Sequence, residues 1–342
     1  MIRYQIRSAK RSDDRDLLEL AAYLDSVNLP NDPAAVHEIL DLSERSFSGS
    51  IGDPRRREYV FVLRDVEKDR AIGTSMVIGQ LGRKDAPYIY FDVLTEEKYS
   101  ATLDRHFVHN VLSIGYSFSG PTEIGGLVLH PDYRRVPERL GMLISYVRFM
   151  FIAVHQADFQ SELLAELLPP LEADGRSPLW EAIGRHFTGM DYREADRLSK
   201  RNKEFVRGLF PDGDIYASLL KPEAQAAIGK VGPQTRGVEK LLRRIGFRYA
   251  DRVDPFDGGP HFVAQTRDVV LVERTRTAIA EPGAVGPSAA RALVARETDA
   301  SPQFLAVASP FREAGERVVL PPETVEHLGV DRGAPVTLLP LD

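Results

Sequence analysis

The sequence predicts an α+β fold, with a mixed sheet and flanking helices followed by a small β-rich C-terminal subdomain. Strand and helix patterns do not alternate regularly, because two helices follow the first strand and several strands then follow one another. Residues 278–300 are rich in Ala, Pro and Gly and lack a clear period, and only short strand patterns follow them. We therefore expect a main domain over 1–280 and a subdomain over 281–342.

The N-terminal elements follow from the spacing of apolar side chains. Residues 1–8 alternate between apolar and polar side chains, which predicts a strand with one solvated face. Residues 12–14 can cap a helix whose apolar stripe extends to Leu24. Further along, the patterns predict a helix over 34–47 and strands over 59–65, 71–78, 88–94, 109–116 and 122–129.

The second half begins with a long amphipathic helix, expected over 139–155. Residues 163–168 fit either a strand or a short helix. Gly246 is placed to end a helix over 235–245, and Phe247 then begins a strand. The other expected elements are helices over 178–187, 192–210 and 222–228, sheet over 262–272, and tail strands over 304–308, 318–320 and 336–339.

Composition limits the class of protein. The 342 residues carry a formal net charge of -6 and include no cysteine, so disulfides, thiolate catalysis and zinc–thiolate sites are excluded. A nucleic-acid-binding protein usually carries the opposite charge balance. No apolar run approaches the roughly 18 residues of a membrane span, and the N-terminus lacks the apolar core of a signal peptide. We expect a cytoplasmic enzyme with small-molecule substrates, without a metal and without a nucleic-acid or membrane partner.

Residues 123–151 carry the clearest chemical signal. A strand runs into a turn with Arg134 and Arg135, then a loop with Arg139 and Gly141, then the long helix. The first turn of a helix has unpaired N–H groups and the positive end of the helix dipole. With arginines and a glycine beside it, such a turn can hold a pyrophosphate. An ordinary strand–turn–helix with solvated arginines fits the same residues.

This segment resembles the acyl-CoA-binding segment of the GNAT acyltransferases, and residues 238–247 resemble the GNAT helix that closes with Gly-Phe before the last hairpin. Further segments resemble the bacterial arginine N-succinyltransferases, over almost the whole chain. They are residues 59–63, 148–151, 177–192 (beginning Ser-Pro-Leu-Trp), 223–235 and 256–260 (Phe-Asp-Gly-Gly-Pro).

The resemblance implies a GNAT-like fold and transfer of succinyl from succinyl-CoA to the α-amine of L-arginine, in arginine catabolism. It implies succinyl-CoA as co-substrate with no permanently bound cofactor, and a homo-oligomer or a pairing with a paralogous subunit. A family contact to succinyl-CoA falls on Leu127. The family's proton-donor histidine falls on Gly232, which cannot carry a proton. The loop after Arg134 is longer than the family's, and only Gly141 matches its glycines.

Proton transfer therefore needs another group. His261 follows the glycine turn, and the nearby carboxylates of Asp254 and Asp257 are expected to raise its pKa toward that of a general acid. A surface histidine on a hairpin is the alternative. Glu123 begins the strand where many GNAT enzymes place a general base, and a solvated strand-end glutamate is its alternative.

The charges of the substrates would also need partners. Asp254 and Asp257 flank the Gly-Gly turn and are the candidates to bind the guanidinium of arginine. For Asp257 the alternative is a turn residue that caps its own backbone. Arg148 is a candidate for the succinyl carboxylate, and a solvated helix arginine is its alternative.

Other functions stay open. Gly232 permits an acyltransferase with a different amine or acyl donor, and it also permits a non-catalytic or weakly active partner subunit. Residues 317–333 resemble swapped-hairpin DNA-binding modules in their Leu-Pro, Leu-Gly and Gly spacing. However, residues 311–342 hold three arginines against six acidic residues, the wrong balance for neutralising phosphates. The tail is therefore interpreted as a structural barrel or an oligomer contact.

Overall fold

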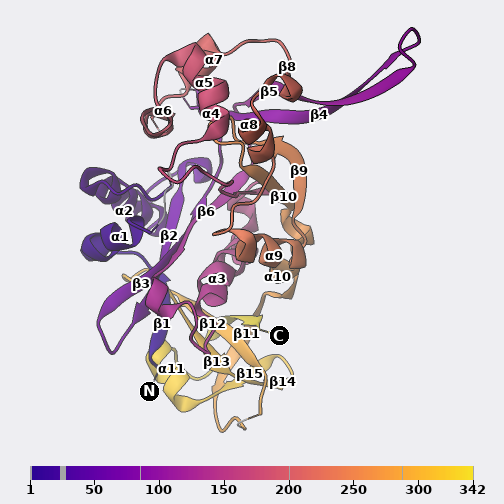
Figure 1. Ribbon diagram of the computed structural model, residues 1–342. Coiled ribbons are helices and arrows are strands. Elements are labelled where there is room, and N and C mark those ends of the chain that lie inside the picture. Colours follow the sequence, from indigo (N-terminus) through magenta and orange to yellow (C-terminus); the bar gives the residue numbers. More distant parts are fainter. Residues whose placement is uncertain (1, 24–27, 85, 200, 287, 342) are drawn as a thin grey trace. The chain divides into compact units, whose positions relative to one another are not determined.

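The computed structural model of the protein (Figure 1) describes residues 2–23, 28–84, 86–199, 201–286 and 288–341. Contacts within the chain define two compact units. Unit 1 comprises Met1–Gln80, Thr122–Ser161 and Thr266–Asp342, and unit 2 comprises Leu81–Pro121 and Glu162–Gln265. The division expected at residue 280 stays a prediction; by these contacts the C-terminal residues belong with the N-terminal strands.

Unit 1 is built on a mixed sheet with the strand order β14-β15-β11-β16-β12-β13-β1-β2-β3-β6. Neighbouring strands are antiparallel except β11 and β15, which are parallel. The strands are β1 (Tyr4–Ser8), β2 (Glu58–Asp65), β3 (Arg70–Ile78), β6 (Thr122–Leu129), β11 (Arg276–Pro282), β12 (Arg291–Glu297), β13 (Phe304–Pro310), β14 (Arg312–Ala314), β15 (Arg317–Leu320) and β16 (Pro335–Pro340).

Helices cover both faces of this sheet around β2. Figure 1 shows α1 (Asp14–Ala21) and α2 (Pro33–Phe47) on one side and α3 (Leu140–Val154) on the other. Val60 and Val62 face the first pair, in a buried cluster with α1 and α2. Phe61 faces α3, where its ring lies 5.4 Å from that of Phe151. Because both faces are covered, β2 has a nearly continuous apolar sequence. The shorter helices of unit 1 are α10 (Val270–Arg274) and α11 (Pro322–Leu328).

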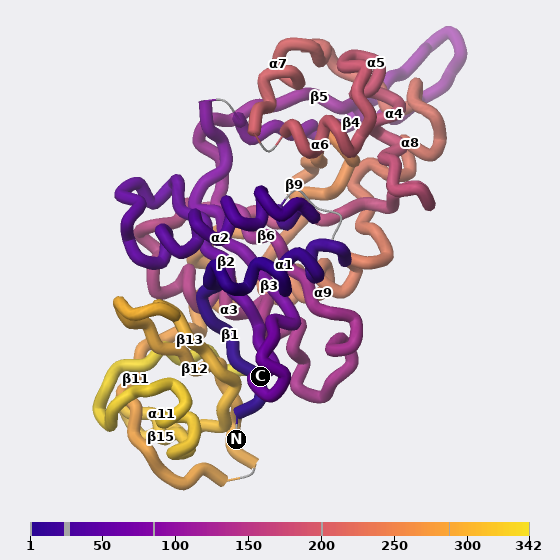
Figure 2. The backbone as a smooth tube through the Cα atoms, turned by 90° about the vertical axis from the view of Figure 1, so that its left-hand side faces the viewer, coloured from indigo at the N-terminus to yellow at the C-terminus, as the bar shows by residue number. Residues whose placement is uncertain are grey.

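The C-terminal strands continue the main sheet. β13 pairs with β1 through Ile6 and Ala306, and Figure 2 shows the orange-to-yellow tail gathered beside the N-terminal strand. The predicted β character of the tail is confirmed, and the tail adds a buried apolar cluster of its own. Among the described helices, none is long and apolar enough to cross a membrane.

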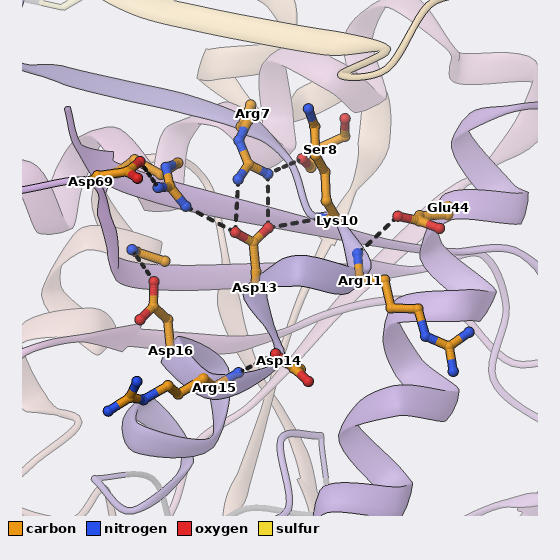
Figure 3. Close-up of polar contacts among 12 residues, drawn as sticks. Arg7, Ser8, Lys10, Arg11, Asp13, Asp14, Arg15, Asp16, Glu44 and Asp69 are labelled. Atoms are coloured by element: carbon orange, nitrogen blue, oxygen red, sulfur yellow. Dashed lines mark hydrogen bonds and ion pairs between the residues drawn. The ribbon is translucent and has the colours of Figure 1, made fainter.

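A buried ion pair ties β1 to the start of α1. Figure 3 shows the guanidinium of Arg7 against the carboxylate of Asp13, with N–O distances of 2.7 and 2.8 Å. Arg64 donates a third bond to the same carboxylate at 2.9 Å, and the backbone N–H of Lys10 a fourth at 2.8 Å. Both charges of the buried pair are therefore satisfied, as buried charges must be.

Unit 2 has an antiparallel sheet with the order β7-β10-β9-β4-β5-β8. Its strands are β4 (Tyr88–Ser100), β5 (Arg105–Ser117), β7 (Glu162–Glu166), β8 (Ile215–Tyr216), β9 (Arg248–Val253) and β10 (Pro260–Gln265). Its helices are α4 (Pro178–Ala182), α5 (Gly184–Thr188), α6 (Tyr192–Ser199), α7 (Glu204–Leu209), α8 (Pro222–Ala227) and α9 (Arg236–Arg244). The chain's single tryptophan, Trp180, is fully buried in the apolar core of this unit.

Several elements differ from expectation. Residues 163–168 lie mostly in strand β7, which resolves the strand-or-helix alternative. The helix expected over 178–187 breaks at Ile183, whose φ of -124° and ψ of -73° are not helical. The helix expected over 192–210 is two helices, α6 and α7, and helix α10 replaces the end of the sheet expected over 262–272. Helix α1 ends at Ala21, and Leu24, the last residue of the expected apolar stripe, lies outside the described residues.

The hairpin of β4 and β5 is longer than its sequence pattern predicts. Each strand has 13 residues, and Figure 1 shows the pair extending beyond the other elements of unit 2. Toward the tip both faces are solvated, so the side chains do not alternate between apolar and polar. Tyr99, Phe107 and Val108 are 65%, 49% and 57% exposed there. We call residues 94–108 the arm.

Candidate active site

In unit 1, the predicted cofactor residues lie along β6 and the start of α3. The pairing of β6 with β3 shifts between the pairs Thr74–Val128 and Met76–Gly125, which places a β-bulge at Gly126 and Leu127. Gly126 has a φ of +56°, and an added Cβ would lie 2.7 Å from the side chain of Met76. Glycine is therefore favoured at this position. Bulges re-aim strand groups beside active sites, and Leu127 lies at this one.

The arginine-rich segment after β6 forms an exposed, positively charged helix start. Arg134, Arg135 and Arg139 are all exposed, and the Arg134 Nε donates to the backbone oxygen of Leu129 at 3.0 Å. Arg139 is the N-cap of α3 in the left-handed conformation, with φ 53°. Outside its own helix, a Cβ added to Gly141 would meet only Leu129, at 3.7 Å, so there is space beside this glycine. The arrangement has the charge and the backbone donors that a pyrophosphate requires.

The alternative that Glu123 is a solvated residue at the strand end is wrong. It is 5% exposed, on β6 opposite Ile78. The side-chain amide of Asn28 donates to its Oε1 at 2.6 Å. A buried, oriented carboxylate close to the bulge is a suitable general base.

In unit 2, His261 is fully buried on β10, so it is not a surface histidine. Its Nδ1 lies 2.8 Å from the Tyr88 hydroxyl, and its Nε2 lies 3.4 Å from an oxygen of Glu166, its partner on β7. Burial lowers the pKa of His261 to about 3, and the positive charges of Lys203 and Arg252 act in the same direction. The expectation that carboxylates raise this pKa is wrong, because desolvation and the two nearby cations lower it. His261 is therefore a neutral imidazole at pH 7.

Asp254 and Asp257 form the turn before β10. Asp254 accepts from the backbone N–H of Phe256 at 2.7 Å, and Asp257 accepts from that of Gly259 at 2.7 Å. Asp257 thus caps its own turn, as its alternative reading proposed. Burial raises the pKa of both carboxyls, and the charge of Asp254 raises that of Asp257 further. A cation beside the pair would lower both pKa values, which is what a bound guanidinium would do.

Three segments that resemble the family meet around this turn. Trp180 stacks on Phe256, with ring centroids 5.0 Å apart and planes at 8°. Ser177 caps α4 by accepting from the Trp180 N–H at 3.0 Å. The N–H of Gly229 donates to the backbone oxygen of Gly258 at 2.9 Å. These motifs therefore hold the backbone that carries the two aspartates and His261.

Gly232, at the family's histidine position, is closely packed. Its N–H donates to the backbone oxygen of Leu168 at 2.8 Å. An added Cβ would lie 2.8 Å from that oxygen and 2.7 Å from the oxygen of Pro169. The backbone has closed around a glycine, so a side chain here requires the chain to move.

The sequence gives no signal for Tyr88 and Glu166. Neither is near His261 in sequence, and only the pairing of β7 with β10 brings Glu166 beside it. Ligand atoms of Glu166, Asp254 and His261 lie within 4.8 Å of one another, a set that could hold a metal ion. The charge of Lys203 acts on both Asp254 and His261, so a cation already lies beside the cluster. We assign no metal to it.

Comparison with known proteins gives consistent matches. The sequence profile of the arginine N-succinyltransferase beta subunit family matches residues 4–271. An arginine N-succinyltransferase of Yersinia pestis is 33% identical, over 98% of this chain and 97% of that protein. The arginine N-succinyltransferase subunit beta of Pseudomonas aeruginosa is 31% identical, over 98% of both chains.

One solved structure agrees in fold over the full length. It is arginine/ornithine succinyltransferase subunit AI from Pseudomonas aeruginosa, with a TM-score of 0.84 at 28% identity over 99% of both chains. The expected α+β, GNAT-like fold is confirmed by this match. Since the family profile matches residues 4–271 and the relatives and the solved structure match over nearly the whole length, the chain belongs to the arginine N-succinyltransferase family.

Proposed function

We propose that this protein is an arginine N-succinyltransferase, an acyltransferase that moves succinyl from succinyl-CoA to the α-amine of L-arginine. The observation that carries the proposal is the bulged strand β6 leading into an arginine-flanked helix start, in a chain that aligns with an arginine N-succinyltransferase of Yersinia pestis over 98% of its length. Succinyl-CoA is a co-substrate here, and the chemistry needs no permanently bound cofactor.

The reaction joins the amine nitrogen to the thioester carbonyl carbon and breaks the carbon–sulfur bond. The amine loses a proton to a base, and the departing thiolate gains one to leave as CoA thiol. Glu123 is the proposed base, because its carboxylate is buried and oriented by Asn28. Backbone N–H groups at the Leu127 bulge are proposed to stabilise the oxyanion, and Arg134, Arg135 and Arg139 to bind the pyrophosphate of CoA.

Residues of unit 2 are proposed to bind the amine substrate. Asp254 and Asp257 offer carboxylates whose raised pKa values would fall when a guanidinium binds. His261 is still proposed as a residue of the site, but as a neutral group. With a pKa of about 3 it resists protonation, so it can exchange hydrogen bonds with Tyr88 but is a poor general acid at pH 7.

The test is to incubate the protein with succinyl-CoA and a panel of amines that includes arginine and ornithine, and to follow the release of free thiol. Glu123→Gln should lower kcat by at least about 100-fold, the lower end of general-base catalysis, and leave the KM for succinyl-CoA nearly unchanged. Asp41→Asn, a change at a solvent-facing carboxylate of α2, is the matched control. No thiol release with any amine would overturn the proposal.

A non-catalytic partner subunit is the second candidate, and Gly232 favours it because the family's proton donor is missing there. In that case the protein should bind succinyl-CoA in calorimetry and release no thiol alone. Gly232→His is a poor rescue variant, since its Cβ would clash with two backbone carbonyls. Activity that appears only after mixing with a paralogous chain would support this function.

We also propose that the protein works in the cytoplasm as a homo-oligomer or with a paralogous subunit. Related proteins are named as subunits. The arm supports an assembly, because it presents Tyr99, Phe107 and Val108 to solvent. A two-stranded ribbon has little stability of its own, so an apolar partner surface would stabilise it.

A further inference from the structure

Arg148 is a buried cation whose partners are all neutral. It lies within α3 and is 2% exposed. Its Nε donates to the backbone oxygen of Ser145 at 3.1 Å and its Nη2 to the Ser145 hydroxyl at 2.8 Å. Its Nη1 lies 3.5 Å from the backbone oxygen of Gly125. No ion pair to Arg148 occurs in the part of the chain that the structure describes.

This environment differs from that of Arg7, the other buried arginine of unit 1. Arg7 is 7% exposed and meets both oxygens of Asp13 (Figure 3). Burial of a charge without an opposite charge is costly. Accordingly, burial lowers the pKa of Arg148 to about 9, and no acidic group opposes the change. An anion at this guanidinium would be strongly favoured.

The guanidinium also lies beside the proposed reaction centre. Its contact with Gly125 places it at β6, two residues before Leu127 in the bulge. Gly125 is also the neighbour of the proposed base, because a Cβ added there would lie 3.2 Å from Glu123 Oε1. The base and the bulge therefore belong to one short segment of β6, and the guanidinium contacts that same segment.

We propose that Arg148 binds the terminal carboxylate of the acyl group and thereby selects a dicarboxylic acyl-CoA over an uncharged one. Three of the five N–H donors of a guanidinium are used by the neutral partners, which leaves two for a carboxylate. In succinyl-CoA this carboxylate is separated from the thioester carbonyl by two methylene groups, so both can lie along the same short segment. The inference rests on the proposed function and adds the residue that sets the acyl donor.

The test compares succinyl-CoA with butyryl-CoA, which has the same number of acyl carbons and no terminal charge. The measured quantity is the ratio of their kcat/KM values, which does not depend on the fraction of folded enzyme. The wild type should favour succinyl-CoA. Arg148→Met should lower kcat/KM for succinyl-CoA by roughly 10- to 100-fold, as expected for hydrogen bonds between charged groups. For butyryl-CoA the value should stay within about threefold, the scale of a context effect.

Arg148→Lys keeps a charge without the planar fork, so its ratio should lie between those of the wild type and Arg148→Met. The lysine variant also tests the proposal if the methionine variant does not fold. Arg57→Met removes a partly buried arginine that is paired with Asp158 at 2.9 Å, and this control should keep the wild-type ratio.

The outcomes separate the two proposals. A wild type that releases no thiol from either donor overturns the proposed function. A wild type that uses both donors equally well overturns the role of Arg148 alone. The same conclusion follows if Arg148→Met or Arg148→Lys lowers kcat/KM for both donors by the same factor.

Discussion

Replacing His261 by glutamine should change how the stability of unit 2 depends on pH. In the folded protein the pKa of this histidine is lowered from 6.5 to about 3, because the ring is fully buried. Between these two values the unfolded chain binds a proton that the folded chain does not. The histidine therefore costs stability progressively as the pH falls through this window, and the cost disappears above it.

The size of the effect follows from the two pKa values. For a shift from 6.5 to about 3, the linkage relation gives a loss of about 2 kcal/mol between pH 6.5 and pH 4.5. Asp254 and Asp257 act in the opposite direction, because their raised pKa values reduce stability as the pH rises above 3.8. Their contribution cancels when the variant is compared with the wild type at each pH.

Trp180 makes the measurement specific for unit 2. It is the single tryptophan of the chain and is stacked on Phe256 in that unit, so its fluorescence reports the unfolding of the unit that holds His261. Urea unfolding at pH 4.5, 5.5, 6.5 and 7.5 should give a flatter pH dependence for His261→Gln than for the wild type. His106→Gln, at a half-exposed histidine of the arm, controls for the loss of any histidine. Parallel curves for wild type and His261→Gln would refute the reasoning that burial keeps this ring neutral.

Three other predictions follow from named contacts. Arg139→Gly removes a charge at the helix start without strain, since glycine accepts a φ of 53°. This variant should weaken CoA binding in calorimetry by about two- to fivefold at low salt, and by less at high salt. Arg312→Ala, at an exposed arginine of β14, should leave that affinity unchanged, and an equal loss in both variants would place the CoA site elsewhere. Arg7→Met leaves Asp13 buried without its main partner and should lower the free energy of unfolding by about 3–5 kcal/mol in urea titrations, and a loss below about 1 kcal/mol would contradict this. Phe107→Glu, at a 49% exposed position of the arm, should lower the molar mass measured by light scattering, and an unchanged mass would exclude the arm as the oligomer contact.

Apolar periodicity predicted the elements whose stripes are continuous and large. The helix expected over 139–155 is α3, Leu140–Val154. Strands β11 and β12 were missed, because part of the side chains they bury are alanines, such as Ala280 and Ala292, which give little contrast with a loop. The strands of the arm were predicted too short for a different reason. Both faces of the arm are solvated, so its apolar and polar residues do not alternate.

The candidate site shows a similar division. Residue identity and resemblance brought Asp254 and His261 into consideration, but burial decides their protonation, and burial depends on strands distant in sequence. His261 follows a glycine turn, which suggests an exposed side chain. However, its strand β10 is a central strand between β7 and β9, and the ring is fully buried. The alternative of a solvated Arg148 is wrong, since the residue is 2% exposed. A single arginine among apolar residues does not show which face of the helix is covered.

The position of Gly232 connects these observations. A lost catalytic side chain usually leaves its space behind, so that restoring the residue restores the function. Here the backbone oxygens of Leu168 and Pro169 lie only 2.8 and 2.7 Å from where a Cβ would be, so the loop leaves no space for a side chain. An active enzyme must then take its proton-transfer group from elsewhere. His261 is held neutral by burial, whereas Glu123 is a buried carboxylate beside the bulge that is proposed to bind the acyl group. The physical case therefore favours Glu123.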